Sequence, residues 1–238
     1  MNTTSRQLPL TLRYPPDQRL DAFFAPPEGA LAQLRALARG GDWLYLAGPE
    51  GVGKTHLALG FCAEAEAIGQ SAHYLPLAAV AGRLGDALPA PQAGAGIAID
   101  GLEHIAGHAN DEVALFHFHN AARAAGAAVL YTARANPDEL GIGLPDLHSR
   151  LGQLTRISLQ PADEAGRIAI LRERAERRGL VLEDAATEWL LRRVDRDLAS
   201  LTRLLDRLDR ESLAAQRRLT VPFLRAVLGG ETEPSRST

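Results

Sequence analysis

Short apolar runs recur through residues 43–159, and segments with helical spacing separate most of them. The runs are rich in aliphatic side chains and carry few charges, as expected for strands buried on both faces of a sheet. Strands are predicted at residues 43–47, 72–77, 96–100, 127–132 and 156–159. Because strands that alternate with helices pair in parallel, the pattern predicts an α/β fold with a five-stranded parallel sheet covered by helices.

The pattern changes at Pro161, after which the strand-like runs stop and only helical spacing remains. Helices are predicted at residues 163–178, 184–193, 197–216 and 221–228. We therefore expect a small all-helical domain after the α/β core. The predicted organisation is a mobile arm over 1–14, the core over 15–160, the helical domain over 161–230 and a disordered tail over 231–238.

The composition narrows the class of protein. The chain has 238 residues, of which 46% are hydrophobic and only 5% aromatic, so its core must consist mainly of aliphatic side chains. The net charge of -3 argues against a broadly basic nucleic-acid-binding protein. No apolar run approaches the ~20 residues of a membrane span. We expect a cytoplasmic protein without a membrane partner, in which the single cysteine, Cys62, is a small buried hydrophobe.

The strongest chemical signal is the segment Gly48-Pro49-Glu50-Gly51-Val52-Gly53-Lys54-Thr55, which matches G-x-x-x-x-G-K-[ST] at every fixed position. It lies between a predicted strand and a helix predicted at 56–65, where a phosphate-binding loop belongs. Glycines allow successive backbone N–H groups to turn toward phosphate oxygens, and the helix N-terminus adds partial positive charge. We predict a site for ADP or ATP with Mg²⁺. The residues expected to bind the nucleotide are Gly48, Gly51, Val52, Gly53, Lys54, Thr55 and His56.

An acid that could hold the metal ends the third predicted strand. Asp100 follows an apolar run, as a Walker B element requires, and would bind Mg²⁺ together with the hydroxyl of Thr55. Many ATPases of this type place a second acid directly afterwards to polarise the attacking water. Here that position is Gly101, and the sequence does not place Glu103 at the water. Slow intrinsic hydrolysis is therefore expected.

Two further segments have two interpretations each. Arg150 lies four residues after Asp146, so it is either a locally paired surface arginine or a group that stabilises charge on a γ-phosphate in a neighbouring subunit. Spacing alone slightly favours the pair. In the arm, alternation over residues 7–12 suits either an extended peptide that docks on a partner or an edge strand of this protein's own sheet.

With these segments taken together, the chain resembles the Hda family of DnaA-related AAA+ proteins, which promote regulatory inactivation of the replication initiator. The segments that carry the resemblance are residues 7–12 (clamp-binding hexapeptide), 99–107 (Walker B region), 144–151 (arginine-finger segment), 195–198 (sensor-2 segment) and 216–223 (C-terminal end). The resemblance runs from the arm to about Leu228. It implies an AAA+ core followed by a helical lid.

The resemblance also implies a mechanism that acts on another protein. An ADP-bound molecule would dock on the DNA polymerase III sliding clamp, its beta subunit, and would present Arg150 to ATP held by DnaA. DNA would be contacted only through the clamp, and homo-oligomer formation stays open. The expected clamp-binding residues are Gln7, Leu8, Leu10 and Leu12, and the expected sensor residues are Thr132 and Arg196.

Two other functions stay open. The first is a helicase-loader or DnaA-paralogue ATPase that assembles on single-stranded DNA and whose own turnover responds to DNA. The second is a non-catalytic adaptor that uses its nucleotide only to hold the lid against the core.

Overall fold

The computed structural model describes residues 18–177, 179–180, 182–191 and 220–228. Five parallel strands form one sheet in the order β2-β3-β4-β1-β5. Their bounds are Leu44–Ala47 (β1), Ala72–Pro76 (β2), Gly96–Asp100 (β3), Ala128–Ala133 (β4) and Thr155–Ser158 (β5). The α/β fold class and the five-stranded parallel sheet are confirmed, and each strand agrees with its predicted bounds to within one residue.

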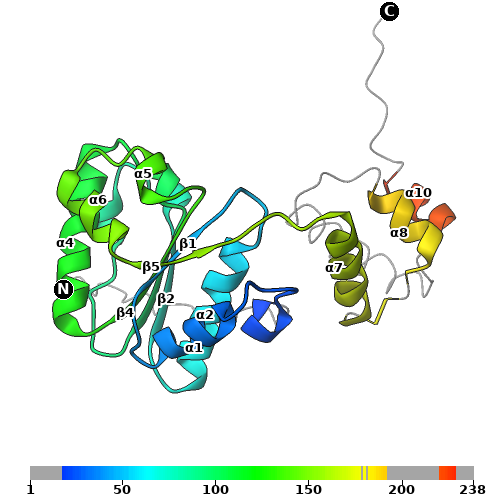
Figure 1. The fold of residues 1–238 in the computed structure, drawn as a ribbon, viewed down its shortest axis with the longest axis horizontal. Helices are drawn as coiled ribbons and strands as arrows, with labels where there is room; N and C mark the ends of the chain where they lie inside the picture. Colours follow the sequence, from blue (N-terminus) through cyan, green and yellow to red (C-terminus); the bar gives the residue numbers. More distant parts are fainter. Residues whose placement is uncertain (1–17, 178, 181, 192–219, 229–238) are drawn as a thin grey trace, which may run out of the picture.

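Helices cover both faces of this sheet. In Figure 1, α4 and α6 lie on one side of the sheet, and α1 and α2 lie on the other. The core helices are α1 (Ala30–Ala38), α2 (Lys54–Ala67), α3 (Leu84–Ala87), α4 (Ala109–Ala125), α5 (Pro137–Leu140) and α6 (Pro145–Gly152). Short 3-10 turns occur at Leu20–Ala22 (η2), Leu77–Ala79 (η3) and Leu102–His104 (η4). The result is a three-layer sandwich.

The sheet order explains how the site is assembled. β4 lies between β3 and β1, and the parallel register aligns Asp100 with Thr132 and Ala47 with Ala133. Ligands of open α/β sheets bind beyond the carboxyl ends of the strands. The loop after β1, the end of β3 and the end of β4 therefore meet at one edge of the sheet.

The core beneath this edge is largely aliphatic. Its fully buried members come from both helix layers and the central strands, and they include Leu34, Leu57, Ile97 and Ile99. Cys62 is also fully buried, as expected for a small hydrophobe. Among the described residues, no helix combines the length and apolar character that crossing a bilayer requires.

A separate group of helices follows β5, on the right of Figure 1. It contains α7 (Glu164–Arg177), α8 (Asp184–Leu191) and α10 (Val221–Leu228). Asp163 caps α7, because its Oδ1 accepts the N–H of Gly166 at 2.7 Å. Gly179 follows α7 with a left-handed φ of 70°. A helical domain after the core is thus confirmed, whereas the arm over 1–14, the helix predicted at 197–216 and the tail over 231–238 lie outside the described residues.

Candidate functional site

The predicted phosphate-binding loop connects β1 to α2. Gly51 and Gly53 both have left-handed backbones, with φ of 77° and 99°. An added Cβ at Gly53 would lie 2.6 Å from a ring carbon of Phe23, so conformation and space both require glycine there. Gly53 precedes α2 and has no side chain to cap the first-turn N–H groups. These amides, together with the positive end of the helix dipole, suit an anion.

Lys54 lies against this loop and is only 9% exposed. Its Nζ donates to the carbonyl oxygens of Gly48 at 2.6 Å and Pro49 at 2.7 Å. Burial lowers the pKa of Lys54, and the nearby charges of Glu103, Asp100 and Glu50 oppose that shift, in decreasing order. A phosphate group at the loop would supply further negative charge for the same ammonium group.

The carboxylate of Asp100 joins the end of β3 to three neighbouring elements. Its Oδ2 accepts the hydroxyls of Thr55 at 2.8 Å and Tyr74 at 2.7 Å. Its Oδ1 accepts the hydroxyl of Thr132, whose Oγ1 accepts the N–H of Gly101 at 3.0 Å. The structure therefore brings together Thr55, Asp100 and Thr132, which were predicted separately.

Tyr74 is a member of this group that sequence reasoning missed. It lies on β2, which pairs with β3, and its hydroxyl reaches Asp100 from the neighbouring strand. Burial, then the charge and hydrogen bond of Asp100, raise the pKa of Tyr74, which keeps the phenol protonated as a donor. Only the pairing of β2 with β3 could have indicated this contact.

The oxygen atoms at this edge fit magnesium bound with a nucleotide. Mg²⁺ usually keeps several waters and takes one or two protein oxygens together with substrate phosphates. The Thr55 hydroxyl and the Asp100 carboxylate provide such oxygens, 2.8 Å apart. Within the described ranges, no group of three or more His, Cys, Asp or Glu side chains could hold a metal by itself. The site therefore suits a metal–phosphate complex and does not form an all-protein cage.

Gly101 stands where many ATPases of this type have a second acid, and its backbone conformation explains the glycine. Its φ is 89°, and an added Cβ would lie 2.8 Å from His104 Cδ2. The same Cβ would lie 4.0 Å from the carboxyl carbon of Glu103. Glu103 Oε2 also accepts the N–H of Arg134, just after β4, at 3.0 Å. The turn η4 thus folds the Glu103 carboxylate back beside position 101, a placement that spacing along the chain did not indicate.

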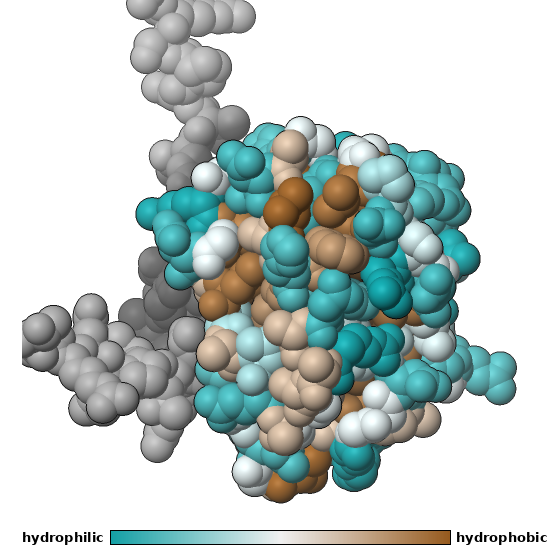
Figure 2. Space-filling view, turned by 90° about the vertical axis from the view of Figure 1, so that its left-hand side faces the viewer, coloured by the Kyte–Doolittle hydropathy of each residue, from teal (hydrophilic) through white to brown (hydrophobic). Residues whose placement is uncertain are grey.

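Arg150 lies on the opposite side of the sheet from α1 and α2, near the end of α6. The segment is helical, as pairing with Asp146 required. However, the structure forms no ion pair between these two side chains, and Arg150 is exposed. The face shown in Figure 2, on the side of α4 and α6, has both polar and apolar residues at its surface. The locally paired interpretation of Arg150 is therefore not confirmed.

Comparisons with known proteins bear on both domains. Residues 163–228 match the family model described as the lid domain of Hda. The structure also matches domain III of the replication initiation protein DnaA from Thermotoga maritima, with a TM-score of 0.74 and 19% identity over 93% of this chain and 99% of that one. Residues 163–228 are thus similar to the Hda lid domain, and the fold of the chain is similar to that of DnaA domain III.

Two further solved structures share this fold. The AMPPCP-bound DnaA from Aquifex aeolicus matches this chain with a TM-score of 0.65 and 18% identity, over 86% of this chain and 69% of that one. The RuvB Holliday junction branch migration motor from Thermotoga maritima matches with a TM-score of 0.65 and 22% identity, over 91% and 72%. At these sequence identities, the two matches show a similarity of fold alone.

Five predicted site residues fall in parts of the chain that the structure does not describe. Arg196 of the sensor-2 segment lies outside the described residues. The same is true of the predicted clamp-binding residues Gln7, Leu8, Leu10 and Leu12.

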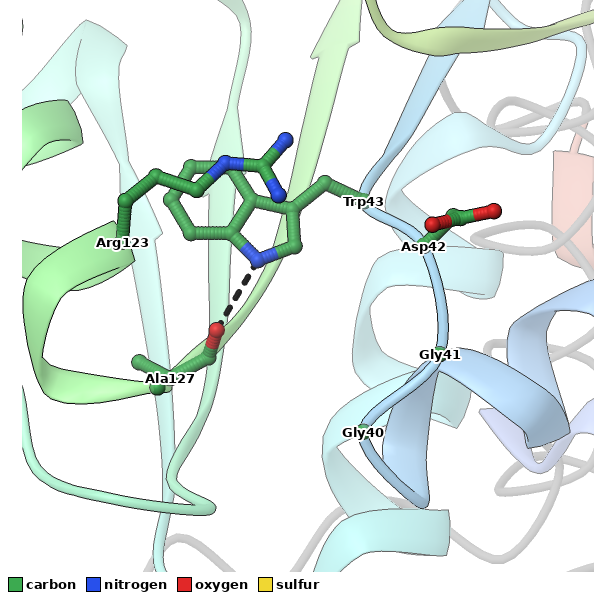
Figure 3. A pocket seen from close by; sticks show the side chains of 7 residues that line it. Gly40, Gly41, Asp42, Trp43, Arg123 and Ala127 are labelled. Carbon is green, nitrogen blue, oxygen red and sulfur yellow. Dashed lines mark hydrogen bonds between the residues drawn. The ribbon is translucent and has the colours of Figure 1, made fainter.

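A cavity of about 370 Å³ lies away from the phosphate loop. Trp43 and Ala127, which line it, directly precede β1 and β4, so it lies at the amino ends of these strands. Trp43 Nε1 donates to the Ala127 carbonyl at 2.9 Å, and the Arg123 guanidinium lies 4.0 Å from the Trp43 ring centroid (Figure 3). Both side chains are therefore engaged in packing between α4 and the sheet, and we assign no ligand to this cavity.

Proposed function

We propose that the chain is a negative regulator of chromosomal replication initiation. In this proposal it binds a nucleotide, docks on the DNA sliding clamp and stimulates hydrolysis of ATP bound to DnaA. The observation that carries the proposal is Arg150, an exposed side chain without an ion-pair partner among the described residues, in a chain whose residues 163–228 match the Hda lid domain. A cytoplasmic location accompanies this function.

The nucleotide would be ADP or ATP with Mg²⁺, held by the loop from Gly48 to Thr55. The geometry of Lys54, Thr55 and Asp100 supports this, as does the AMPPCP bound to a DnaA of the same fold. Lys54 would exchange its two loop carbonyls for phosphate oxygens. When bound, the metal would neutralise phosphate charge, with Thr55 and Asp100 as its protein oxygens.

Hydrolysis by this site itself is expected to be slow, because Gly101 carries no acid to polarise water. The main chemistry would take place in the partner. There Arg150 would donate from its planar guanidinium to the γ-phosphate of DnaA-bound ATP and stabilise the charge that develops on it. An arginine supplied in this way accelerates phosphoryl transfer by roughly 10³- to 10⁵-fold in other systems.

The arm would bring the protein to its place of action. Gln7, Leu8, Leu10 and Leu12 would dock on the beta subunit of DNA polymerase III as an extended peptide. The motif over residues 7–12 supports this step. Contact with DNA would then be indirect, through the clamp.

The test measures hydrolysis of radiolabelled ATP bound to DnaA, with the ADP-loaded chain present, and with or without DNA-loaded clamp. We expect faster hydrolysis only when the clamp is loaded. Arg150→Ala should abolish the stimulation, and Arg150→Lys should restore little of it, because an ammonium lacks the planar fork of a guanidinium. Arg83→Ala serves as the control and should stimulate hydrolysis like wild type. Arg83 is also an exposed arginine, and its guanidinium donates to the nearby carbonyl oxygen of Ala79.

Two results would redirect the proposal. Turnover by the chain's own site that rises with single-stranded DNA would favour the DnaA-paralogue or helicase-loader function. A silent Arg150→Ala variant, combined with loss of clamp binding in Gln7→Ala, would favour the non-catalytic adaptor.

A further inference from the structure

Two adjacent acids in the first turn of α4 are almost completely buried. Asp111 and Glu112 are each 2% exposed. A buried carboxylate is costly unless hydrogen bonds replace its water, and both side chains accept backbone N–H groups from distant loops. The positive end of the α4 dipole further stabilises their negative charge.

Asp111 holds the segment that follows β2. Its Oδ2 accepts the N–H of Gly82 at 2.5 Å, and its Oδ1 accepts the N–H of Leu84 at 3.0 Å. His108 Nδ1 also lies 3.7 Å from Oδ2. These contacts fix the start of α3 and do not involve α6.

Glu112 instead joins two other segments. Its Oε1 accepts the N–H groups of Gly107 at 2.7 Å and Gly143 at 3.0 Å. Its Oε2 accepts the N–H of Leu144 at 2.7 Å. One carboxylate thus connects the loop between η4 and α4 to the loop that leads into α6.

The second of these loops sets where α6 begins. Leu144 is the N-cap residue of α6, and its carbonyl accepts the N–H of His148 at 3.0 Å. The N-cap has no side-chain capping bond of its own. Buried Leu147 and Leu151 hold the apolar face of the helix, but hydrophobic contacts are not directional. Two directional restraints therefore act at this end of α6. One is the pair of bonds from Gly143 and Leu144 to the buried Glu112, and the other is the more exposed contact of His148 Nε2 with Asp138 Oδ1 at 3.1 Å.

We propose that Glu112 is a positioning residue for Arg150, which lies six residues after Leu144 on the same helix. Through Gly107 the same carboxylate is connected to the segment that follows Asp100 and η4. Glu112 therefore links the orientation of α6 to the nucleotide-binding edge of the core. This inference rests on the proposed function of Arg150.

The main test is Glu112→Gln in the DnaA-ATP hydrolysis assay with loaded clamp. The amide preserves side-chain shape but keeps only one acceptor oxygen, so in either orientation one of the bonds from Gly143 and Leu144 is lost. We expect the stimulated rate constant to fall roughly 10- to 100-fold, because small misplacements of catalytic groups have effects of this size. The concentration of the chain that gives half-maximal stimulation and its affinity for ADP should both stay within about twofold, since Glu112 is almost completely buried and its hydrogen bonds go to the loops before α4 and α6.

Asp111→Asn is the matched control. It changes a neighbouring acid with the same burial and the same type of hydrogen-bond partners, but it affects only the segment of Gly82 and Leu84. We expect it to lower stability as Glu112→Gln does while leaving the stimulated rate close to wild type. If Glu112→Gln does not fold, Glu112→Asp keeps the charge on a shorter side chain and should show the same selective loss.

A double variant separates positioning from a general structural role. Arg150→Lys keeps a little stimulation, so a further loss can be measured in that background. If Glu112 acts through the guanidinium of Arg150, adding Glu112→Gln to Arg150→Lys should cause a much smaller fold loss than adding it to wild type. The inference is overturned if the folded Glu112 variants stimulate like wild type, if Asp111→Asn loses as much, or if Glu112→Gln causes the same fold loss in both backgrounds. If wild type itself does not stimulate, the proposed function fails first and this inference fails with it.

Discussion

Gly101 follows Asp100 at the nucleotide-binding edge, and its replacement tests why this chain lacks a second acid there. Its left-handed φ of 89° is accessible to glycine but strained for other residues. An added Cβ would also lie 2.8 Å from His104 Cδ2. Gly101→Ala therefore introduces backbone strain and a steric overlap, and Gly101→Glu adds a carboxylate close to that of Glu103.

The expected loss of stability follows from the backbone strain, the steric overlap and the change in entropy of the unfolded chain. A left-handed backbone costs an L-residue about 1–2 kcal/mol. His104 is exposed and can rotate away from the overlap, at about 0.5–1.5 kcal/mol for an off-rotamer side chain. Alanine has less conformational freedom than glycine in the unfolded chain, and this difference stabilises the folded variant by about 0.4–1 kcal/mol. We expect Gly101→Ala to lower the free energy of unfolding by about 1–3 kcal/mol, with Tm falling by about 2–4 °C for each kcal/mol.

The assay is urea unfolding of the variant beside Gly107→Ala. Gly107 also has a left-handed φ, of 82°, but an added Cβ there meets no atom within 4 Å. Gly107→Ala should therefore show the backbone cost alone, and Gly101→Ala should lose more stability. Adding His104→Ala to Gly101→Ala should remove the difference.

Gly101→Glu should not create a faster ATPase. The new side chain would begin beside His104 and 4.0 Å from the Glu103 carboxyl carbon, where a second negative charge is unfavourable. The reasoning fails if Gly101→Ala is as stable as wild type, or if it loses no more stability than Gly107→Ala. A large rise in intrinsic hydrolysis in Gly101→Glu would also refute it.

Two further outcomes can be checked directly. Lys54→Ala should weaken nucleotide binding roughly 10- to 100-fold, the range for a lost charge-assisted hydrogen bond, in a titration with fluorescent ADP and Mg²⁺; unchanged affinity would contradict the assigned site. Burial, then the charges of Arg123 and Arg150, lower the pKa of His119 to about 4. The unfolded chain, with an ordinary histidine pKa near 6.5, therefore binds more protons between these values. Stability should rise with pH across this window, by about 3 kcal/mol in total, and be lost again on acidification. Urea unfolding from pH 4 to 7 measures this rise in the free energy of unfolding. The rise should be smaller in His119→Gln and unchanged in His117→Gln, which replaces an exposed histidine of the same helix.

Much of the fold could be predicted because its signals are local. A central parallel strand is buried on both faces and must be apolar along its length, so β1, β3 and β4 appear in the sequence as short continuous runs. The phosphate-binding loop is equally local, since its conformation depends on glycines at fixed positions within eight residues. Helix ends are local as well, as Asp163 and Gly179 at the two ends of α7 illustrate.

The parts of the site that escaped prediction connect residues far apart in the chain. The hydrogen bond from Tyr74 to Asp100 spans 26 residues, and that from Leu144 to Glu112 spans 32. Neither partner carries a pattern that points to the other. For Arg150, in contrast, the local pattern suggested a contact that the structure does not form. Asp146 and Arg150 lie four residues apart on α6, which suits an ion pair, but no ion pair joins these two side chains.

From the sequence alone it was possible to predict an α/β core with a complete phosphate-binding loop, an acid at the end of a central strand and a helical domain after the core. These features depend on apolar periodicity, on glycine conformation and on the spacing of a few side chains. The three-dimensional structure was needed to show which side chains meet at the edge of the sheet. It placed Tyr74 on Asp100, folded Glu103 beside a left-handed Gly101 and joined α6 to α4 through Glu112. The physical reason is that strand order and loop docking arise from burial summed over the whole core, which no single segment encodes.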